Sequence, residues 1–499
     1  MSTFLQHGSS PIGRRRLLAR AGGQLAAVAL LAACGGTATT TSGGTTAAVS
    51  AAATTAAATS AAASSAATSA AATGASTAVS ASAASTASQA AVAGKGVTVN
   101  YWDAFSGTNG NAVQQLVKNF NASQSGVTVN YQFQGTYEQT AQKIATALAA
   151  HQAPDVAILS DVWWIKYYLD GAITALDPYL KQNAIDPASY VDSFFQEGIK
   201  SGKSYWLPFA RSTPLFYYNA DLFASAGVQP IQKWDDLVTA GQKLMGTGAG
   251  GAPRYAFANA NGNSYIAWVF QPLNWAFGGE YSDADFKMHF TDPATMAAAQ
   301  YFSDLVNKEK IANNPTDIVA AFTNGLTATA LMSTASLAGI EKTVNGKFKI
   351  GTSFLPTEKT FGCCTGGAGL SLLTSSPSDT KQAAFKWMAF ATNEDSTIYW
   401  SQNTGYMPVQ KSALTSAKMT DFYTAHPNFK TAVDQLPKTR GQDLARVAIP
   451  NGDQIIGDAL EALVIKNQPV QTVFTDLQQN MTAKAAPIIK QLATLAKGG

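Results

Sequence analysis

The chain has 499 residues, 46% of them hydrophobic, and its 34 basic and 31 acidic residues give a formal net charge of +3. Four of the basic residues are arginines before Cys34, a segment without acids, which leaves 30 basic and 31 acidic residues from Cys34 onward. That balance, with lysine and glutamate scattered along the chain, excludes the basic stripe that binding to DNA or RNA requires.

The segment that ends at Cys34 is typical of an export signal. Arginines at 14, 15 and 16 precede an apolar run from Leu25 to Ala33, directly before Cys34. The run is far shorter than the ~20 residues that cross a bilayer, so we predict a cleaved signal peptide over residues 1–33. The motif "LAACG" resembles the lipobox of bacterial lipoproteins, which implies a diacylglycerol on the Cys34 sulfur. The arginine run resembles a twin-arginine signal, with Sec export as the alternative.

The next segment, residues 34–94, is predicted to be a flexible tether. From Gly35 to about Ala93 it consists almost entirely of Ala, Ser, Thr and Gly. Such a composition buries too little apolar surface to offset the entropy lost on ordering the chain. Glycosylation of its hydroxyls stays open. The part from residue 95 onward holds all nine tryptophans and, at ~100–200 residues per domain, should form two lobes or more.

The folded part begins with alternating strand and helix patterns. Strands are predicted over residues 96–105, 126–135 and 154–160, with helices over 111–125 and 136–152 between them. Strands that alternate with helices indicate a mainly parallel sheet with both faces buried, which agrees with the wholly apolar third strand. Ligands of such sheets bind beyond the carboxyl ends of the strands, so we place a candidate site there.

The same alternation continues to the end of the chain, which predicts an α/β protein without sequence repeats. The later expected elements are a strand and a short helix over 213–228, helices over 234–246, 293–310 and 380–393, strands over 328–335 and 366–375, and helices over 452–496.

The sequence offers little for catalysis. None of its four histidines stands with Cys, Asp or Glu at a metal-ligand spacing, and the usual nucleophile, nucleotide and zinc-protease motifs are missing. Glu138 and Asp161 could converge as a glycosidase pair, although single acids on such turns more often accept hydrogen bonds from ligand hydroxyls. We therefore expect a binding protein without metal or cofactor, with a surface glycosidase or adhesin as the remote alternative.

Two further features stay open at this stage. Cys363 and Cys364 are adjacent, and this spacing fits neither a zinc site nor a redox motif, so they form either a strained vicinal disulfide or two buried thiols. The chain is rich in aromatic pairs such as Trp163 and Trp164. Most of these rings should belong to the core, and the rest could stack on sugars or bind a quaternary ammonium.

Five motifs, taken in order, resemble the extracellular solute-binding proteins, family 1, of ABC importers. They are "FNASQSGVTVNYQ", "APDVAIL", "PFARSTPLFYYNADLFASAGV" with "WDDL" soon after, "FTNGLTATALMSTASLAGI" and "NTGYMPV". The resemblance implies a monomeric receptor with the two-lobed type II fold, which closes about a hinge and delivers its solute to a permease. The expected lobes are 95–212 with 366–410, and 213–365 with 411–499, the latter including the C-terminal helices. The lipid anchor would hold the receptor at the outer face of the cytoplasmic membrane.

The segments "GTYEQ", "RSTPLFYYN", "CTGGAGLSLL" and "YWSQNTGYMPV" resemble the glycerol-3-phosphate and glycerophosphodiester binders within that family. This likeness implies ligand contacts at Tyr137, Asp161, Ser212, Ser333, Gly366 and Tyr406, with Glu138 beside them. The segment "ANANGNSYIAW" carries an insertion where the subgroup has a tryptophan, so Trp268, Tyr265 or neither replaces it, and Trp268 is the residue we place in the site. Arg446 is the candidate for its phosphate-binding arginine. Without such an arginine, a neutral oligosaccharide such as maltose would fit as well.

Overall fold

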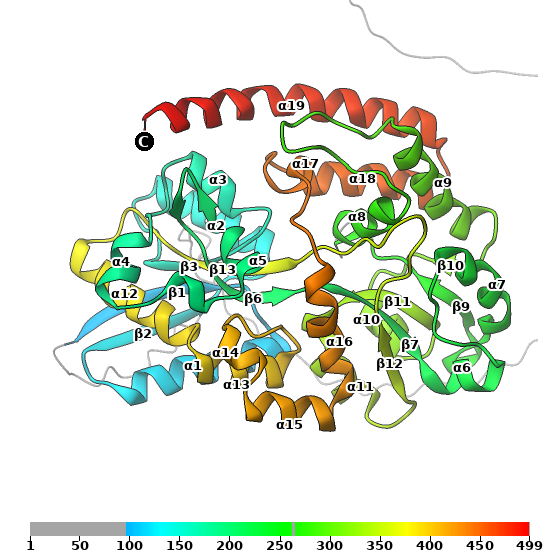
Figure 1. The fold of residues 1–499 in the computed structure, drawn as a ribbon, viewed down its shortest axis with the longest axis horizontal. Helices are drawn as coiled ribbons and strands as arrows, with labels where there is room; N and C mark the ends of the chain where they lie inside the picture. The colour runs from blue at the N-terminus through cyan, green and yellow to red at the C-terminus, as the bar shows by residue number, and fades with distance from the viewer. Residues whose placement is uncertain (1–95, 262–264, 499) are drawn as a thin grey trace, which may run out of the picture. The chain divides into compact units, whose positions relative to one another are not determined.

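The computed structural model describes residues 96–261 and 265–498, which form two main β-sheets with helices packed around them (Figure 1). The predicted signal peptide, Cys34 and the predicted tether lie outside the described residues. Within them, strands and helices alternate along most of the chain, so the predicted α/β class is confirmed.

The first sheet has five strands in the spatial order β2-β1-β3-β13-β6. Their bounds are β1 (Val97–Asp103), β2 (Val127–Phe133), β3 (Val156–Ser160), β6 (Leu207–Ser212) and β13 (Gly366–Leu372). β1 pairs in parallel with β2 and β3, as the strand-helix alternation predicts. β13 instead runs antiparallel to both β3 and β6, because it enters from the second sheet and not through a crossover helix.

Helices cover both faces of this sheet. In the first half of the chain they are α1 (Gly107–Ser123), α2 (Tyr137–Ala149), α3 (Trp164–Leu169), α4 (Asp177–Gln182) and α5 (Asp192–Gln196). Every residue of β3 is buried, which is what its continuous apolar sequence predicts. α2 begins at a capping box, in which the Thr136 hydroxyl accepts from the Gln139 N–H and the Gln139 side chain accepts from the Thr136 N–H.

The second sheet has the order β10-β9-β11-β7-β12, with β8 paired to β9. Its strands are β7 (Pro214–Asn219), β8 (Gly246–Thr247), β9 (Pro253–Ala258), β10 (Ala312–Asn313), β11 (Thr327–Ser333) and β12 (Ile350–Ser353). The neighbouring helices are α6 (Ala220–Ala226), α7 (Trp234–Leu244), α8 (Ile266–Ala276), α9 (Pro293–Asn307), α10 (Ile318–Thr323) and α11 (Leu337–Val344). A separate hairpin pairs β4 (Ile199–Lys200) with β5 (Lys203–Ser204).

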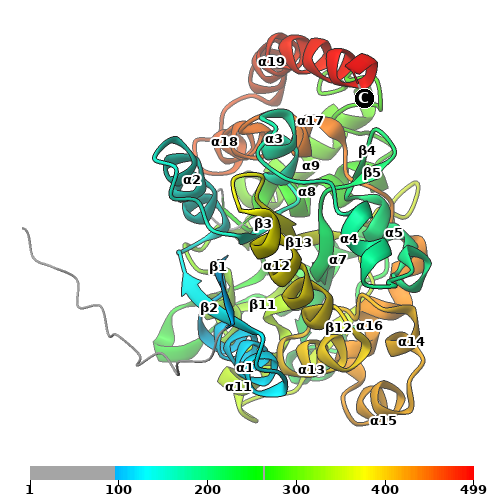
Figure 2. The same ribbon diagram turned by 90° about the vertical axis from the view of Figure 1, so that its left-hand side faces the viewer.

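From Ser378 onward the described chain is helical. The helices predicted over 380–393 and 452–496 are confirmed, whereas the helices between them were not predicted. The helices are α12 (Ser378–Ala391), α13 (Glu394–Thr404), α14 (Lys411–Leu414), α15 (Ala417–Ala425), α16 (Pro427–Gln435), α17 (Leu444–Val447), α18 (Gly452–Val464) and α19 (Val470–Gly498). α12 packs on β1 and β13 of the first sheet (Figure 2), whereas α16 packs on β7 and β12 of the second.

The final helix, α19, runs over elements of both sheets (Figure 1). Near its start, the ring of Phe474 packs against Phe270 of α8, at a centroid distance of 6.4 Å. Further along, Ile488 is buried in a cluster with Trp164 of α3, and the Gln491 side chain donates to the Leu169 carbonyl at 3.0 Å. One helix therefore contacts the elements around both sheets.

The chain passes directly between the sheets at Thr213, which separates β6 from β7. It returns between β12 and β13, through a segment that ends at Thr365. A third segment comes close where the Met407 N–H donates to the Arg211 carbonyl at 2.8 Å. Three stretches far apart in the sequence therefore lie together where the two sheets meet.

The end of β1 carries a buried carboxylate, Asp103, whose Oδ1 accepts a hydrogen bond from the Tyr101 hydroxyl at 3.0 Å. Burial is the main influence on this group and raises its pKa from 3.8 to about 7, although hydrogen bonds from the Ala104 N–H and from Tyr101 lower it. Asp103 therefore changes charge near neutral pH inside the folded protein.

The contribution of Asp103 to stability should fall as the pH rises from about 4 to about 7. Because the folded pKa of about 7 lies above the unfolded value of 3.8, this contribution is complete below the unfolded pKa and is fully lost once the pH has passed the folded one. Asp103→Asn removes this titration. The unfolding free energies of both proteins are measured in urea at each pH. Between about pH 4 and pH 8, wild type should lose on the order of 4 kcal/mol relative to Asp103→Asn. Parallel pH profiles would contradict this assignment.

Candidate functional site

Several predicted site residues lie at the edge of the first sheet where β3 and β6 end. Asp161 directly follows β3, and Ser212 is the last residue of β6. Because β13 runs in the opposite direction, its first residue, Gly366, reaches the same edge and pairs with Ser212. The backbone N–H of Asp161 donates to the Gly367 carbonyl at 3.0 Å. These residues therefore meet at the edge where ligands of open α/β sheets bind.

Trp268 of α8 reaches this edge from the elements around the second sheet. Its indole N–H donates to the Thr365 carbonyl at 3.1 Å. Its ring covers Gly366 so closely that a Cβ atom at this glycine would lie 2.6 Å from the ring. Tyr265 stands behind, with its ring edge-on to Trp268 at a centroid distance of 5.7 Å. Of the two aromatic candidates, Trp268 is the one that contacts Gly366.

Ser333, the last residue of β11, lies beside the passage between the sheets. It pairs with Pro214, and the next residue, Thr334, donates its N–H to the Thr213 carbonyl at 3.1 Å. The Ser333 hydroxyl oxygen accepts from the Ala335 N–H at 3.2 Å. The end of β11 in the second sheet therefore lies beside Thr213, where the chain passes from the first sheet to the second.

Arg446 forms the charged centre of this region. It lies on the short helix α17 and is only 5% exposed. Its Nε donates to Asp453 at 2.6 Å, and its Nη1 lies 3.4 Å from Oδ2 of Asp161. Gln442 completes the network, because its carbonyl accepts from Arg446 while its amide donates to Asp161. An ion pair therefore links α17 with the end of β3.

The charge of Arg446 is secured by its partners. Burial alone would lower the pKa of its guanidinium, but the carboxylates of Asp453 and Asp161 more than compensate and raise it. A charge buried this deeply is stable only when it is paired and hydrogen-bonded. Arg446 is therefore a permanent cation, and the position of Asp161 depends on it.

An aromatic group lies beside these charges. The Tyr137 and Tyr406 hydroxyls are 3.2 Å apart. The ring of Phe105 lies 5.9 Å from that of Tyr137 and 5.8 Å from that of Tyr406, and Trp400 stacks on Tyr406 at 5.4 Å. Burial is the main reason that the pKa of both tyrosines is raised, so both hydroxyls stay neutral and can donate as well as accept. We call these four residues the aromatic group.

Glu138 does not join the buried cluster. It is exposed in the first turn of α2, where a negative charge favours the helix N-terminus. Asp161 is buried in the network with Arg446. Among the described residues the two carboxylates share no hydrogen-bond partner, so nothing in the geometry supports a glycosidase pair. The ligand-binding role of Glu138 stays a prediction, as do the roles of the residues that do cluster.

Sequence reasoning missed two sets of partners. Gln442 and Asp453, which hold Arg446, carry no motif, although their spacing of four and seven residues from Arg446 would have suggested a shared face of a continuous helix. Arg211 and Glu197, which form a second ion pair at 2.5 Å, have no such spacing.

Within residues 96–261 and 265–498, no cluster of three or more His, Cys, Asp or Glu side chains could hold a metal ion.

Comparison with known proteins places this arrangement in a family. Residues 115–431 match the family described as "Bacterial extracellular solute-binding protein". The chain belongs to this family. This solute-binding protein is 26% identical over 401 residues to the sn-glycerol-3-phosphate-binding periplasmic protein UgpB of Yersinia enterocolitica, a match that covers 76% of this chain and 90% of that protein.

Solved structures agree with the family and with the fold. UgpB from Mycobacterium tuberculosis, in complex with glycerophosphocholine, is 36% identical with a TM-score of 0.74, and the match covers 79% of this chain and 100% of that one. Maltose-bound MalE3 of T. maritima is 18% identical with a TM-score of 0.68, covering 77% of this chain and 99% of the other, and shows the fold alone. The family resemblance and the two-lobed fold predicted from the sequence are confirmed. None of the described helices is both long and apolar enough to cross a membrane.

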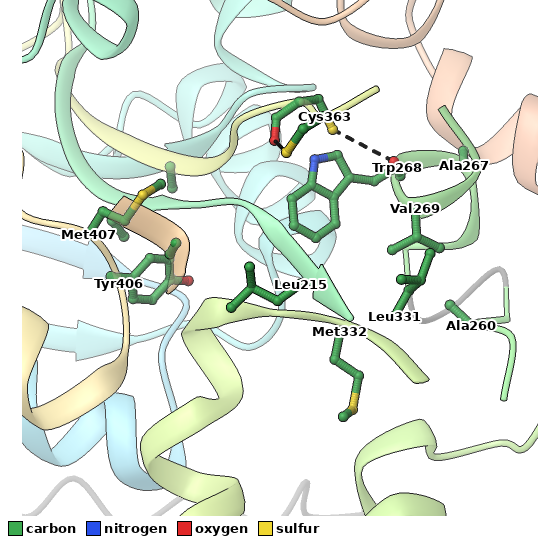
Figure 3. Packing of buried hydrophobic residues seen from close by; sticks show 14 of the residues in the cluster. Leu215, Ala260, Ala267, Trp268, Val269, Leu331, Met332, Cys363, Tyr406 and Met407 are labelled. Atoms are coloured by element: carbon green, nitrogen blue, oxygen red, sulfur yellow. Dashed lines mark hydrogen bonds between the residues drawn. The ribbon is translucent and has the colours of Figure 1, made fainter. Parts of the chain in front are cut away.

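Both cysteines after Cys34 are free thiols, buried where the chain passes between the sheets. The Cys363 sulfur lies 3.2 Å from the Thr213 hydroxyl, and the Cys364 thiol donates to the Trp268 carbonyl at 3.8 Å. Figure 3 shows Cys363 beside Trp268 among the buried residues. Burial is the main cause that raises the pKa of Cys363 to about 12 and that of Cys364 well above its usual value. Reactive thiolates are therefore scarce here, which indicates a packing role.

Maleimide labelling followed by peptide mass mapping should reflect this burial. In the native protein near pH 8, the peptide that contains Cys363 and Cys364 should remain unlabelled, because its thiols are both protonated and shielded. In guanidinium chloride without reductant, the same peptide should carry two labels. An unlabelled peptide under denaturing conditions would show a vicinal disulfide instead.

Proposed function

We propose that this solute-binding protein captures a glycerophosphodiester between its lobes and delivers it to the permease of an ABC importer. The observation that carries the proposal is the buried Arg446, held beside Asp161 where the elements of the two sheets meet. The glycerophosphocholine complex of the M. tuberculosis relative supports the choice of ligand class.

Arg446 and Asp161 offer complementary chemistry to such a ligand. The hydrogen bonds that hold Arg446 engage its Nε and Nη1, so we assign the remaining nitrogen, Nη2, to a phosphate oxygen. The Asp161 carboxylate accepts hydrogen bonds, which suits the hydroxyls of glycerol. Ser212 and the Gly366 backbone would add neutral contacts on the first sheet, Ser333 a contact on the second.

The charges around Arg446 favour a phosphodiester over glycerol 3-phosphate. One guanidinium faces two carboxylates, Asp161 and Asp453. A phosphodiester adds one negative charge, whereas a phosphomonoester adds about 1.5 to 2 at pH 7. The second charge would meet the carboxylates in a buried setting, where repulsion is weakly screened. We therefore expect the diester to bind more tightly than the monoester.

The aromatic group suits a cationic head group. The faces of aromatic rings attract quaternary ammonium ions. The Tyr137 and Tyr406 hydroxyls are 3.2 Å apart, and Trp400 stacks behind Tyr406 at a centroid distance of 5.4 Å. A zwitterion such as glycerophosphocholine would place its phosphate near Arg446 and its choline near these rings. A neutral oligosaccharide would use the rings for stacking but would not use the permanent charge of Arg446 in binding.

The mechanism is capture by closure, with no covalent step. We propose the lobe boundaries predicted from the sequence, with residues 95–212 and 366–410 in one lobe and residues 213–365 and 411–499 in the other. Ligand contacts from both lobes stabilise the closed form relative to the open one, and the permease would recognise the closed form. The predicted lipid on Cys34 and the tether would keep this monomeric receptor beside the permease after export.

Calorimetric titration with glycerophosphocholine, glycerol 3-phosphate and maltose tests the proposed ligand. Saturable binding of glycerophosphocholine is expected, with glycerol 3-phosphate weaker by about ten-fold or more because of its additional charge, and with no response to maltose. Saturation by maltose without a response to either phosphate would establish the oligosaccharide alternative. Chromatography of the ligand after incubation provides the check for turnover, and any product would make the protein an enzyme.

Replacement of Arg446 tests the phosphate assignment. Arg446→Gln should weaken glycerophosphocholine binding by about ten-fold or more, because a hydrogen bond to a charged group is lost. Arg446→Lys keeps the positive charge but lacks the planar guanidinium, so its affinity for glycerophosphocholine should lie between those of wild type and Arg446→Gln. The matched control is Arg254→Gln, since Arg254 contacts only backbone carbonyls of the β8 region among its described hydrogen bonds. Unchanged affinity in a folded Arg446 variant would remove this residue from the site.

A further inference from the structure

Arg211 is a fully buried cation that the proposed ligand site does not use directly. Its guanidinium carbon lies 4.8 Å from the ring of Trp206 and 5.5 Å from the ring of Phe194. Within the described part of the chain, its Nε and Nη1 have no hydrogen-bond partner. The ring faces account for this arrangement, because they attract a cation without supplying conventional acceptors. The side chain is therefore held in one direction, toward Glu197.

Glu197 joins Arg211 to a distant part of the chain. Its Oε2 accepts from Arg211 Nη2 at 2.5 Å, while its Oε1 accepts from the Thr365 hydroxyl. Thr365 belongs to the segment that returns from the second sheet to the first, directly before β13. Through its carbonyl, Thr365 also accepts from the Trp268 indole. One carboxylate thus ties β6 to the returning segment.

The backbone of Arg211 holds the third segment. Its carbonyl accepts from the Met407 N–H at 2.8 Å, in an antiparallel bridge between these two residues. Arg211 is therefore bonded to all three places where the chain lies between the sheets. It precedes the passage at Thr213, reaches the returning segment through Glu197, and binds the third segment through its own backbone.

Each tied residue is the neighbour of a proposed ligand contact. Ser212 follows Arg211, Gly366 follows Thr365, and Tyr406 precedes Met407. We infer that Arg211, Glu197 and Thr365 form a positioning network that holds Ser212, Gly366 and Tyr406 in register for the solute. This inference rests on the proposed function, since it takes those three residues as ligand contacts. It adds residues that act through them and do not touch the solute.

Thr365 is the informative position of the network. Removal of Arg211 or Glu197 would leave an unpaired charge in a buried place, and the variant could simply fail to fold. Thr365→Val is nearly isosteric and removes only the hydroxyl that orients Glu197, leaving the ion pair intact. Thr365→Ser restores the hydroxyl in a smaller side chain. The matched control is Thr329→Val, since the buried Thr329 hydroxyl donates to the Ala256 carbonyl at 2.7 Å within the second sheet.

Glycerophosphocholine titration gives the first result. Thr365→Val should bind about ten-fold more weakly than wild type because a charge-assisted hydrogen bond is lost, Thr365→Ser should bind close to wild type, and Thr329→Val should be unchanged. Thermal unfolding of the same proteins separates an effect on binding from an effect on stability. If the Thr365 hydroxyl were merely structural, Thr365→Val and Thr329→Val would both unfold at lower temperatures and would bind glycerophosphocholine equally well. Wild-type affinity in a folded Thr365→Val would overturn the inference.

Hydrogen–deuterium exchange supplies a result that needs no ligand. Peptides that cover residues 211–213, 365–367 and 406–408 should exchange faster in Thr365→Val than in wild type, Thr365→Ser or Thr329→Val, since the three segments lose a shared restraint. If wild type binds neither phosphate, the proposed function fails, and this exchange pattern still decides the network. Unchanged exchange at all three segments would overturn the network, whatever the solute.

Discussion

The structure depends on the insertion of β13 between β3 and β6. This strand runs antiparallel to both neighbours, so its first residue, Gly366, lies at the edge where β3 and β6 end. A parallel strand in that place would have put its last residue there and its first at the far edge. Because β13 follows β12 of the second sheet, the same pairing also returns the chain from the second sheet to the first. Strand order, the position of the site and the connection between the lobes therefore follow from one set of backbone hydrogen bonds.

Two buried ion pairs lie near this edge, and each connects different segments of the chain. Arg446 and Asp161 join α17 to the end of β3, so their contact depends on how the elements of the two sheets approach each other. Arg211, a residue of β6, and Glu197 connect the segments that pass between the sheets. Buried pairs contribute little net stability because desolvation offsets their attraction, and their usual value is in specifying one geometry. A receptor that must close reproducibly around a small solute benefits from such directional contacts.

The strands and helices could be predicted well where the sequence pattern is local. The alternating and continuous apolar runs of β1, β2 and β3 and the spacing in α1 and α2 reflect burial that each segment carries in its own sequence. β6 was not predicted, because its sequence, "LPFARS", combines a proline with an arginine that is fully buried only through Glu197 and two aromatic rings. The antiparallel direction of β13 was not predicted either, since strand direction is set by connections and not by composition.

The same limit applies to the site. Motif resemblance located Asp161, Ser212, Gly366 and Tyr406, and these residues do lie around one edge of the first sheet. The resemblance left open whether Trp268, Tyr265 or neither takes the place of the subgroup's tryptophan, and in the structure it is the indole of Trp268 that packs on Gly366. Glu138 and Asp161 are both acids on predicted turns, yet one is exposed and the other buried, because helix α2 turns Glu138 toward solvent.

By itself, the sequence determined the α/β class, the family and the absence of familiar catalytic motifs, because these depend on local periodicity and on short ordered patterns. Only the tertiary structure decided which charged side chains form ion pairs, which aromatic ring covers Gly366, and how Arg211 contacts three segments of the chain. Several of these contacts join residues more than a hundred positions apart, such as Glu197 with Thr365 and Asp161 with Arg446. No local pattern encodes such a pair, since each partner is specified only by the packing of everything between them.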